Sequence, residues 1–160
     1  MTIKVGDKIP SVKLRHMTDQ GMQTITTDEL FKGKKVVLFG LPGAFTPTCS
    51  AKHLPGFVTN AETIKKKGID AIACLSVNDA FVMSAWGKEQ KAGDKVMMLA
   101  DGNADFSKAV GLTMDGTNYG MGTRACRYAM VVDNGTVKAL NVEAPGAFEV
   151  SSAEAVIKAL

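Results

Sequence analysis

The sequence has few cysteines, and none of them stands in a C-x-x-C pair. Cys49, Cys74 and Cys126 form an odd, widely spaced set. This spacing excludes the dithiol motif of thiol–disulfide oxidoreductases and the zinc knuckle. The two histidines, His16 and His53, do not complete a metal-ligand pattern with the cysteines. We therefore expect neither a metal nor another cofactor.

Long apolar runs and a concentrated charge of one sign are also missing. The chain carries 19 Lys and Arg against 16 Asp and Glu, a formal net charge of +3, whereas nucleic-acid-binding proteins usually show a dense basic face. The cluster Lys65-Lys66-Lys67 falls at the expected end of a helix, where cations meet the negative end of the dipole. No stretch reads as a signal peptide or a membrane span. We expect a cytoplasmic protein that binds neither nucleic acid nor membrane.

The sequence does contain a regular alternation of strand and helix patterns. Its 160 residues suffice for one domain, which we assign to residues 1–160. Near-continuous or alternating apolar runs predict strands at 11–17, 22–27, 34–41, 69–77 and 95–101. Helical patterns lie at 29–31, 46–67, 78–90 and 104–112.

The last third of the chain predicts a hairpin followed by a helix. Asn134-Gly135 between alternating apolar runs is a strong turn signal, so we expect a hairpin over 126–143. Ser151 opens a capping-box pattern that starts the last helix. The order of elements favours an α/β fold with a central mixed sheet flanked by helices on both faces. It is compatible with a thioredoxin-like fold, but the pattern alone does not separate this from other small α/β folds.

Local signals place the helix ends. Thr27 or Asp28 is expected to cap the first helix, and Asn78 or Asp79 the helix at 78–90. Pro55-Gly56 lies inside the long helical segment at 46–67 and is expected to kink it.

The stretch "PGAFTPTC", residues 42–49, follows a buried strand and ends in a cysteine. Pro47 suits the first turn of a helix and Thr46 its N-cap. Cys49 then lies in the first turn, where unpaired backbone amides favour a negative charge such as a thiolate. Ligands of open α/β sheets bind beyond the carboxyl ends of strands, and this turn lies at such a position. A reactive cysteine is therefore favoured over a buried, inert one.

His53 lies four residues after Cys49, on the same helix face. A Cys–His pair is typical of some hydrolases. No orienting acid for His53 is evident, so we favour a surface or supporting role for it.

At Pro42, Thr46 and Cys49 the sequence matches the P-x-x-x-T-x-x-C active-site motif of peroxiredoxins. The stretches "KKVVLFGLPGAFTPTCSAKHLPGF", "CLSVNDAFVMSAWGK", "RYAMVVDNGTVKALNVE" and "VSSAEAVIKAL" resemble the peroxiredoxin-five and plant type II subfamily nearly end to end. The resemblance implies a thioredoxin-like fold. It also implies a thiol-dependent peroxidase that reduces hydrogen peroxide and alkyl hydroperoxides.

By this resemblance Cys49 is the peroxidatic cysteine, which attacks a peroxide oxygen and becomes a sulfenic acid. Thr46 would hydrogen-bond the thiolate and the peroxide, and Pro42 would shield the site from bulk water. Peroxide binding is assigned to Gly43 and Thr48 together with Cys49.

The family's active-site arginine matches Arg127, in the stretch arginine–aromatic–small–Met. An arginine on an apolar strand also needs a partner. Arg124 is the less secure candidate, because a strand regular through both residues would put them on opposite faces. In the same regular strand, Cys126 points away from Arg127.

The resemblance does not settle how the sulfenic acid of Cys49 is reduced back to the thiol, a reaction we call the reset step. The region "FEVSSAE", where some relatives carry a resolving cysteine, has none. Cys74 matches the second cysteine of plant members and is a candidate resolving cysteine, but inert burial fits its apolar strand equally well. We favour an external thiol, glutathione with glutaredoxin or thioredoxin, and expect a homodimer. The alternatives are a general thiol–disulfide oxidoreductase and a peroxide-sensing or holdase-type binding protein.

Overall fold

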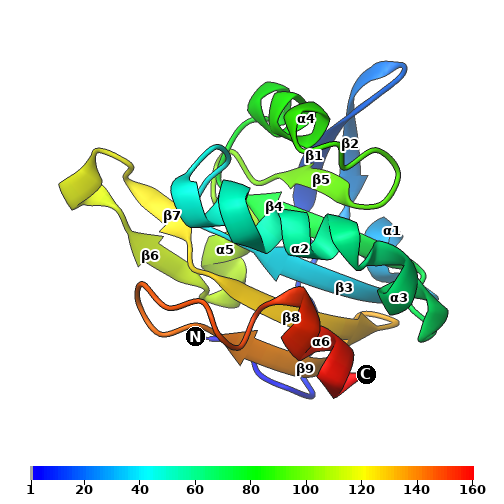
Figure 1. Ribbon diagram of the computed structural model, residues 1–160. Coiled ribbons are helices and arrows are strands. Elements are labelled where there is room, and N and C mark those ends of the chain that lie inside the picture. Colours follow the sequence, from blue (N-terminus) through cyan, green and yellow to red (C-terminus); the bar gives the residue numbers. More distant parts are fainter. Residues whose placement is uncertain (1) are drawn as a thin grey trace.

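A computed structural model describes residues 2–160 and shows a mixed sheet of seven strands in the order β2-β1-β5-β4-β3-β8-β9 (Figure 1). Three parallel strands form its centre: β3 (Lys35–Gly40), β4 (Ala71–Ser76) and β5 (Met97–Ala100). Antiparallel pairs extend it on both sides: β1 (Lys13–Thr18) with β2 (Gly21–Thr26), and β8 (Tyr128–Asp133) with β9 (Thr136–Val142). The turn at Asn134-Gly135 has positive φ at both residues, as predicted for this hairpin.

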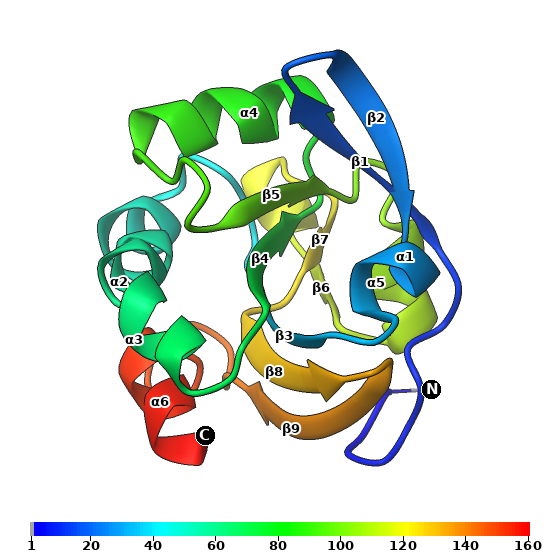
Figure 2. The ribbon, with the colours of Figure 1, turned by 90° about the vertical axis from the view of Figure 1, so that its right-hand side faces the viewer.

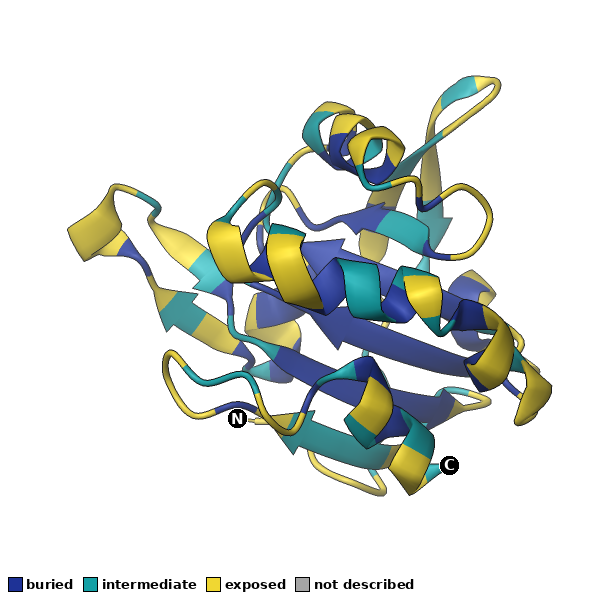
Figure 3. Cartoon of the chain, in the orientation of Figure 1, coloured by how far each residue is buried: buried dark blue, intermediate teal, exposed yellow. Residues whose placement is uncertain are grey.

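The sheet is covered on both faces, and β3 shows why its sequence is apolar throughout. Val37 and Phe39 face one core and Val36 and Leu38 face the other, so both faces of the strand from Val36 to Phe39 are packed in hydrocarbon. Figure 3 shows the central strands as buried. The predicted mixed sheet with helices on both faces is confirmed.

Two groups of helices form these layers (Figure 2). The core that contains Val37 is covered by α2 (Leu54–Thr59), α3 (Ala61–Lys66), α4 (Ala80–Glu89) and α6 (Ala153–Ala159). The opposite core is covered by α1 (Thr27–Phe31) and α5 (Asp105–Val110).

The segment predicted as one helix over 46–67 has three parts. The π-helical turn η1 (Cys49–His53) leads into α2, and α3 follows after a break at Asn60. Pro55 has no N–H and crowds the preceding turn, and just before it the Leu54 N–H reaches back to the carbonyl of Cys49. The interruption expected at Pro55-Gly56 is therefore present as a change of helix type immediately before Pro55. The helix widens before Pro55 and breaks after it.

The predicted caps are partly corrected. Thr26, not Thr27 or Asp28, caps α1, because its hydroxyl accepts from the Glu29 N–H while Thr27 is buried. Asp79 caps α4, as one of the two predicted residues. Within residues 2–160, no helix is both long and apolar enough to span a bilayer.

A small two-stranded sheet projects from the fold as an arm that the sequence analysis did not predict (Figure 1). It consists of β6 (Thr113–Asp115), the 3₁₀ turn η2 (Thr117–Tyr119) and β7 (Thr123–Ala125). Because β8 begins only at Tyr128, Arg127 lies in a break between two strands. The regular strand that would separate Arg124 from Arg127 therefore does not exist.

Candidate active site

The loop 42–49 carries Cys49 from the end of β3 into a helix. Helical backbone begins at Pro47, and the Thr46 carbonyl accepts from the Ser50 N–H at 2.9 Å. Phe45 has φ 64°, a left-handed conformation that is strained for a bulky residue. Outside contacts fix the loop, because the Ala44 N–H donates to Asn78 Oδ1 at 3.0 Å.

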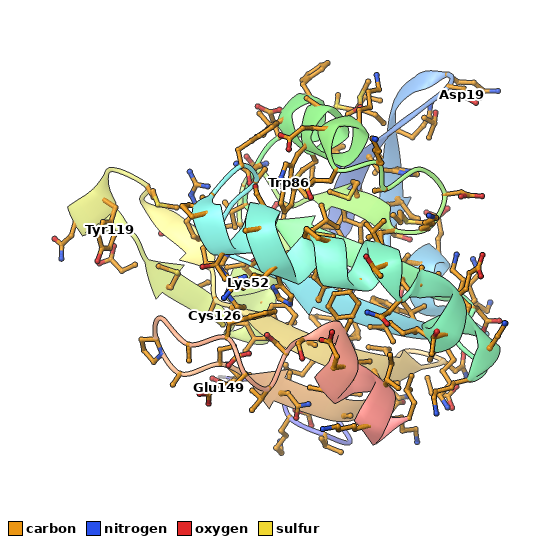
Figure 4. All side chains as sticks on the ribbon, viewed as in Figure 1. Asp19, Lys52, Trp86, Tyr119, Cys126 and Glu149 are labelled. Atoms are coloured by element: carbon orange, nitrogen blue, oxygen red, sulfur yellow. The ribbon has the colours of Figure 1, made fainter. Side chains whose placement is uncertain are left out.

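A second contact holds the helix that follows the loop. Trp86 is a buried residue of α4, labelled in Figure 4 between α4 and the helix that follows the loop, and its Nε1–H donates to Ser50 Oγ at 3.0 Å. The position of Cys49 is therefore fixed from both sides of its own helix turn.

The defining contact of the site joins Cys49 to Arg127. Arg127 Nη2 donates to Cys49 Sγ at 3.2 Å across 78 residues of sequence. Cys49 is fully buried, so the guanidinium is the polar partner of a sulfur otherwise packed in the core. The guanidinium thus places a positive charge and a hydrogen-bond donor directly beside the sulfur.

His53 orients the same guanidinium. Its Nδ1 lies 2.9 Å from Arg127 Nη1, and its Nε2 lies 3.0 Å from the Ser151 carbonyl. A carbonyl only accepts and a guanidinium only donates, so the proton is on Nε2 and the Nδ1 lone pair faces Arg127. Burial and the Arg127 charge lower the pKa of His53 to about 3, which keeps the ring neutral. His53 is buried, so of the two roles predicted for it the supporting one is correct and the surface one is wrong.

The loop 143–151 supports the pair of His53 and Arg127. The edge of Phe148 packs on His53 with ring centroids 5.1 Å apart, and Arg127 Cζ lies 5.8 Å from the Phe148 centroid. Ser151 supplies the carbonyl that accepts from His53 and is itself bonded to Glu143 through its hydroxyl at 2.6 Å. The predicted capping box at Ser151 is therefore wrong, and Ser152 caps α6 instead.

Thr46 lies beside Cys49 in the chain but bonds elsewhere. Its hydroxyl donates to the Gly43 carbonyl at 2.7 Å. Among residues 2–160, the side-chain donor to Cys49 Sγ is Arg127 and not Thr46. Thr46 Oγ1 therefore has its proton engaged and its lone pairs available as acceptors.

Arg124 binds the backbone at the start of the loop 42–49. Its Nε donates to the Met121 carbonyl at 2.9 Å and its Nη1 to the Pro42 carbonyl at 3.3 Å. A Cβ on Gly43 would lie 3.0 Å from Arg124 Nη1, so this arginine packs closely on the glycine. Thr48 is exposed. Both arginines reach the segment that carries Cys49, although only Arg127 reaches its sulfur.

The other two cysteines lie in different surroundings. Cys74 is fully buried in β4, in the same core as Cys49, and burial raises the pKa of its thiol well above the usual range. Cys126 packs against the opposite core, and burial raises its pKa as well. In the described part of the chain, no three His, Cys, Asp or Glu side chains gather as metal ligands.

Sequence reasoning missed Glu143, Phe148 and Ser151 as parts of the site. Their signals were weak, since an acid after an apolar strand and a serine before a helix are ordinary. The spacing of His53 from Cys49 was the one clue to a buried supporting histidine.

Comparison with known proteins identifies the arrangement. The redoxin family model matches residues 4–157. The chain is 52% identical over 164 residues to the chloroplastic peroxiredoxin-2E-2 of Oryza sativa subsp. japonica, which covers 99% of this chain and 73% of that protein.

Solved structures agree. Reduced Prx3 of Vibrio vulnificus in complex with hydrogen peroxide has a TM-score of 0.96 and 54% identity, covering 99% of each chain. Oxidised Prx3 of the same organism has a TM-score of 0.92 and 55% identity, covering 99% of this chain and 100% of that one. The fold is therefore thioredoxin-like, and the chain belongs to the redoxin family as a peroxiredoxin, a thiol-dependent peroxidase that consumes peroxide.

Proposed function

We propose that Cys49 reduces hydrogen peroxide and alkyl hydroperoxides, and that an external thiol, glutathione with glutaredoxin or thioredoxin, resets it. The observation that carries the proposal is the hydrogen bond from Arg127 Nη2 to Cys49 Sγ at 3.2 Å. It places a fixed cation beside the one sulfur that also lies in the first turns of a helix.

In the first step the Cys49 thiolate attacks one peroxide oxygen. A sulfur–oxygen bond forms while the oxygen–oxygen bond breaks, and the departing oxygen takes a proton from water and leaves as water or an alcohol. Cys49 becomes a sulfenic acid. Prx3 of Vibrio vulnificus binds hydrogen peroxide in its reduced form, which supports the same substrate here.

The role proposed for Arg127 is stabilisation of the transition state. A free thiol is already a few per cent thiolate at neutral pH, so complete ionisation gains at most about thirtyfold. A fixed donor aimed at developing negative charge is worth about 10²–10³ in rate. Arg127 is held by His53 at 2.9 Å, and it therefore meets the separating oxygens without first having to be oriented.

The loop 42–49 binds the peroxide next to Arg127. Because the Thr46 hydroxyl donates to the Gly43 carbonyl, its oxygen is free to accept the peroxide O–H. Pro42 covers the sulfur, and its carbonyl is tied down by Arg124. Gly43 keeps the backbone close to the bound peroxide, whereas the exposed Thr48 lies at the rim.

The reset step uses an external thiol rather than Cys74. Burial raises the pKa of the Cys74 thiol, so Cys74 stays a neutral thiol, which is a poor nucleophile toward a sulfenic acid. A small thiol such as glutathione attacks the Cys49 sulfur, water leaves, and a second thiol then releases Cys49 and carries away the disulfide. Cys49 is buried, so this step requires the strained loop at Phe45 to open. Such a reductant suits a reducing compartment such as the cytoplasm.

We also propose a homodimer through the face beside this loop. Phe45 is 51% exposed and Phe81 is 64% exposed. Exposed aromatic side chains of this size are typical of protein interfaces. Sedimentation of the wild type and of Phe81→Asp tests the dimer, which the added charge should dissociate.

The reductant is tested by steady-state peroxide consumption with glutathione and glutaredoxin or with thioredoxin, measured side by side. Cys49→Ser is the negative control and Cys74→Ala the matched cysteine control, which should keep full turnover. Intact-mass analysis after one equivalent of peroxide should show one added oxygen. After glutathione is then added, it should show a glutathione adduct. A persistent Cys49–Cys74 bridge in the monomer would overturn the external-thiol proposal.

A further inference from the structure

A buried carboxylate, remote from the reacting sulfur, organises the loop that supports Arg127. Glu143 follows β9 and is 8% exposed. Its Oε2 accepts from the N–H groups of Glu149, Val150 and Ser151 at 2.9, 2.9 and 2.8 Å, and from Ser151 Oγ at 2.6 Å. A buried carboxylate is costly unless it is satisfied in this way.

The ionised state of Glu143 is the one that these bonds select. Burial alone raises the pKa of Glu143, but the hydrogen bonds from Ser151, Glu149 and Val150 lower it overall. An ionised carboxylate only accepts hydrogen bonds, and the loop presents only donors to Oε2. The loop 143–151 therefore closes around a charge rather than around an apolar contact.

This loop reaches Arg127 by three routes. The Glu143 N–H donates to the Arg127 carbonyl at 2.9 Å, which fixes the backbone of the arginine. At its far end the loop holds the guanidinium indirectly, because the Ser151 carbonyl fixes the His53 proton on Nε2 and leaves Nδ1 to accept from Arg127. Phe148 adds a third contact, to both His53 and Arg127.

We infer that Glu143 is a positioning residue for the peroxidase reaction. Its carboxylate holds Ser151 and Phe148 in place, and these hold His53 and Arg127 in the geometry that serves Cys49. The inference rests on the proposed function of Arg127. It extends the machinery to a residue that touches neither the sulfur nor the peroxide.

The test is a double-mutant cycle on the rate of Cys49 sulfenic acid formation. Glu143→Gln keeps the shape and removes the charge, and it should slow the reaction with hydrogen peroxide about tenfold or more, because small misplacements of a catalytic group are costly. In an Arg127→Ala background the same change should cost less than about twofold. Glu154→Gln, an exposed acid in α6, is the matched control and should change nothing.

Two further readouts separate positioning from a merely structural role. Alkylation of Cys49 by iodoacetamide at a pH where it is fully ionised should be unchanged in Glu143→Gln. Imidazole nitrogen NMR should show a single Nε2–H tautomer for His53 in the wild type and a mixture in the variant. If Glu143→Gln does not fold, Ser151→Ala, which keeps the carbonyl, should show the same pattern at smaller amplitude.

The outcomes are distinct. If the loss is equal in the Arg127 and Arg127→Ala backgrounds, or if no loss occurs, Glu143 does not act through Arg127 and the inference is wrong. An unchanged His53 tautomer in a slowed variant also overturns it. If Arg127→Ala alone leaves the rate intact, the proposed function of Arg127 fails first, and this inference fails with it.

Discussion

Two regions meet at Cys49, and they are built in opposite ways. The segment 42–53 combines bonds between near neighbours, such as Thr46 on the Gly43 carbonyl, with contacts to Asn78 and Trp86, which lie 34 and 36 residues away. The region around Arg127 and the loop 143–151 meets the first segment through hydrogen bonds that span 74 to 98 residues.

The difference lies in where each region's order comes from. Pro47 and the helix start shape the first region locally, and the contacts from Asn78 and Trp86 hold the strained loop at Phe45 and the turn that follows it. The second is ordered by a buried charge and by hydrogen bonds that exist only in the folded protein. Substitutions in the two regions should therefore affect activity and stability in different ways. Four predictions test this contrast, and they are ordered from the largest expected effect to the smallest.

Cys49→Ser should abolish peroxide turnover, because a hydroxyl at this position is not ionised near neutral pH and cannot form a sulfenic acid. Peroxide consumption with either reductant measures this. Residual turnover above the Cys74→Ala, Cys49→Ser double variant would show that a second cysteine reacts.

Arg127→Ala should slow sulfenic acid formation about 10²–10³-fold, the worth of one fixed donor to developing charge. The thiolate fraction, read from ultraviolet absorbance against pH, should explain no more than about thirtyfold of that loss. Stopped-flow kinetics of the variant gives the rate. If the titration accounts for the whole loss, the donor mechanism is wrong.

His53 should make the protein sensitive to mild acid. Its pKa is lowered to about 3 when folded and is about 6.5 when unfolded, so the unfolded state binds the proton first as the pH falls. The contribution of neutral His53 to the free energy of unfolding is therefore largest above pH 6.5 and declines as the pH falls toward 3. Compared with His53→Gln, the wild type should lose about 1–2 kcal/mol of unfolding free energy between pH 6.5 and 5.

Urea denaturation at several pH values measures this difference. His16 is present in both proteins and cancels. The pKa of Glu143 is lowered in the folded state, so its contribution to stability is lost only at lower pH. The interval from pH 6.5 to 5 therefore reports on His53 and not on Glu143. Parallel stability curves for the two proteins would mean that His53 is not held neutral by the fold.

Phe148→Leu should have the smallest effect, about two- to fivefold in peroxide rate, because a cation–π contact of this kind is worth about 0.5–1 kcal/mol. Tyr119→Leu, at the exposed tip of the β6–β7 arm, serves as the control. Pre-steady-state oxidation measures both. A loss as large as that of Arg127→Ala would move Phe148 from support to direct catalysis.

The sequence analysis predicted the first region better than the second, for a physical reason. Strand and helix periodicity, the hairpin turn and the helix start near Cys49 are local properties, and they were correct apart from helix ends, the breaks within 46–67 and the β6–β7 arm. Arg127 was found through the motif around it rather than through its contacts.

The supporting residues depend on packing that no local pattern encodes. Ser151 reads as a capping residue because a Glu stands three positions later, but the buried Glu143 offers its hydroxyl a stronger acceptor. The strand break before Tyr128 likewise follows from the arm and the site together. His53 looks like a surface residue until the sheet and the loop 143–151 close over it.

The closing of one loop around one carboxylate bears on how this chemistry can be moved between proteins. Grafting "PGAFTPTC" onto the strand end of another α/β scaffold would transfer the nucleophile but leave behind the acid that arranges its electrostatic partner. A functional graft needs three separate segments in their correct relative positions: the segment with Cys49, the segment around Arg127 and the loop 143–151. Searches for new peroxidases that rely on the short motif alone will accordingly collect proteins that carry the sulfur and lack the reaction.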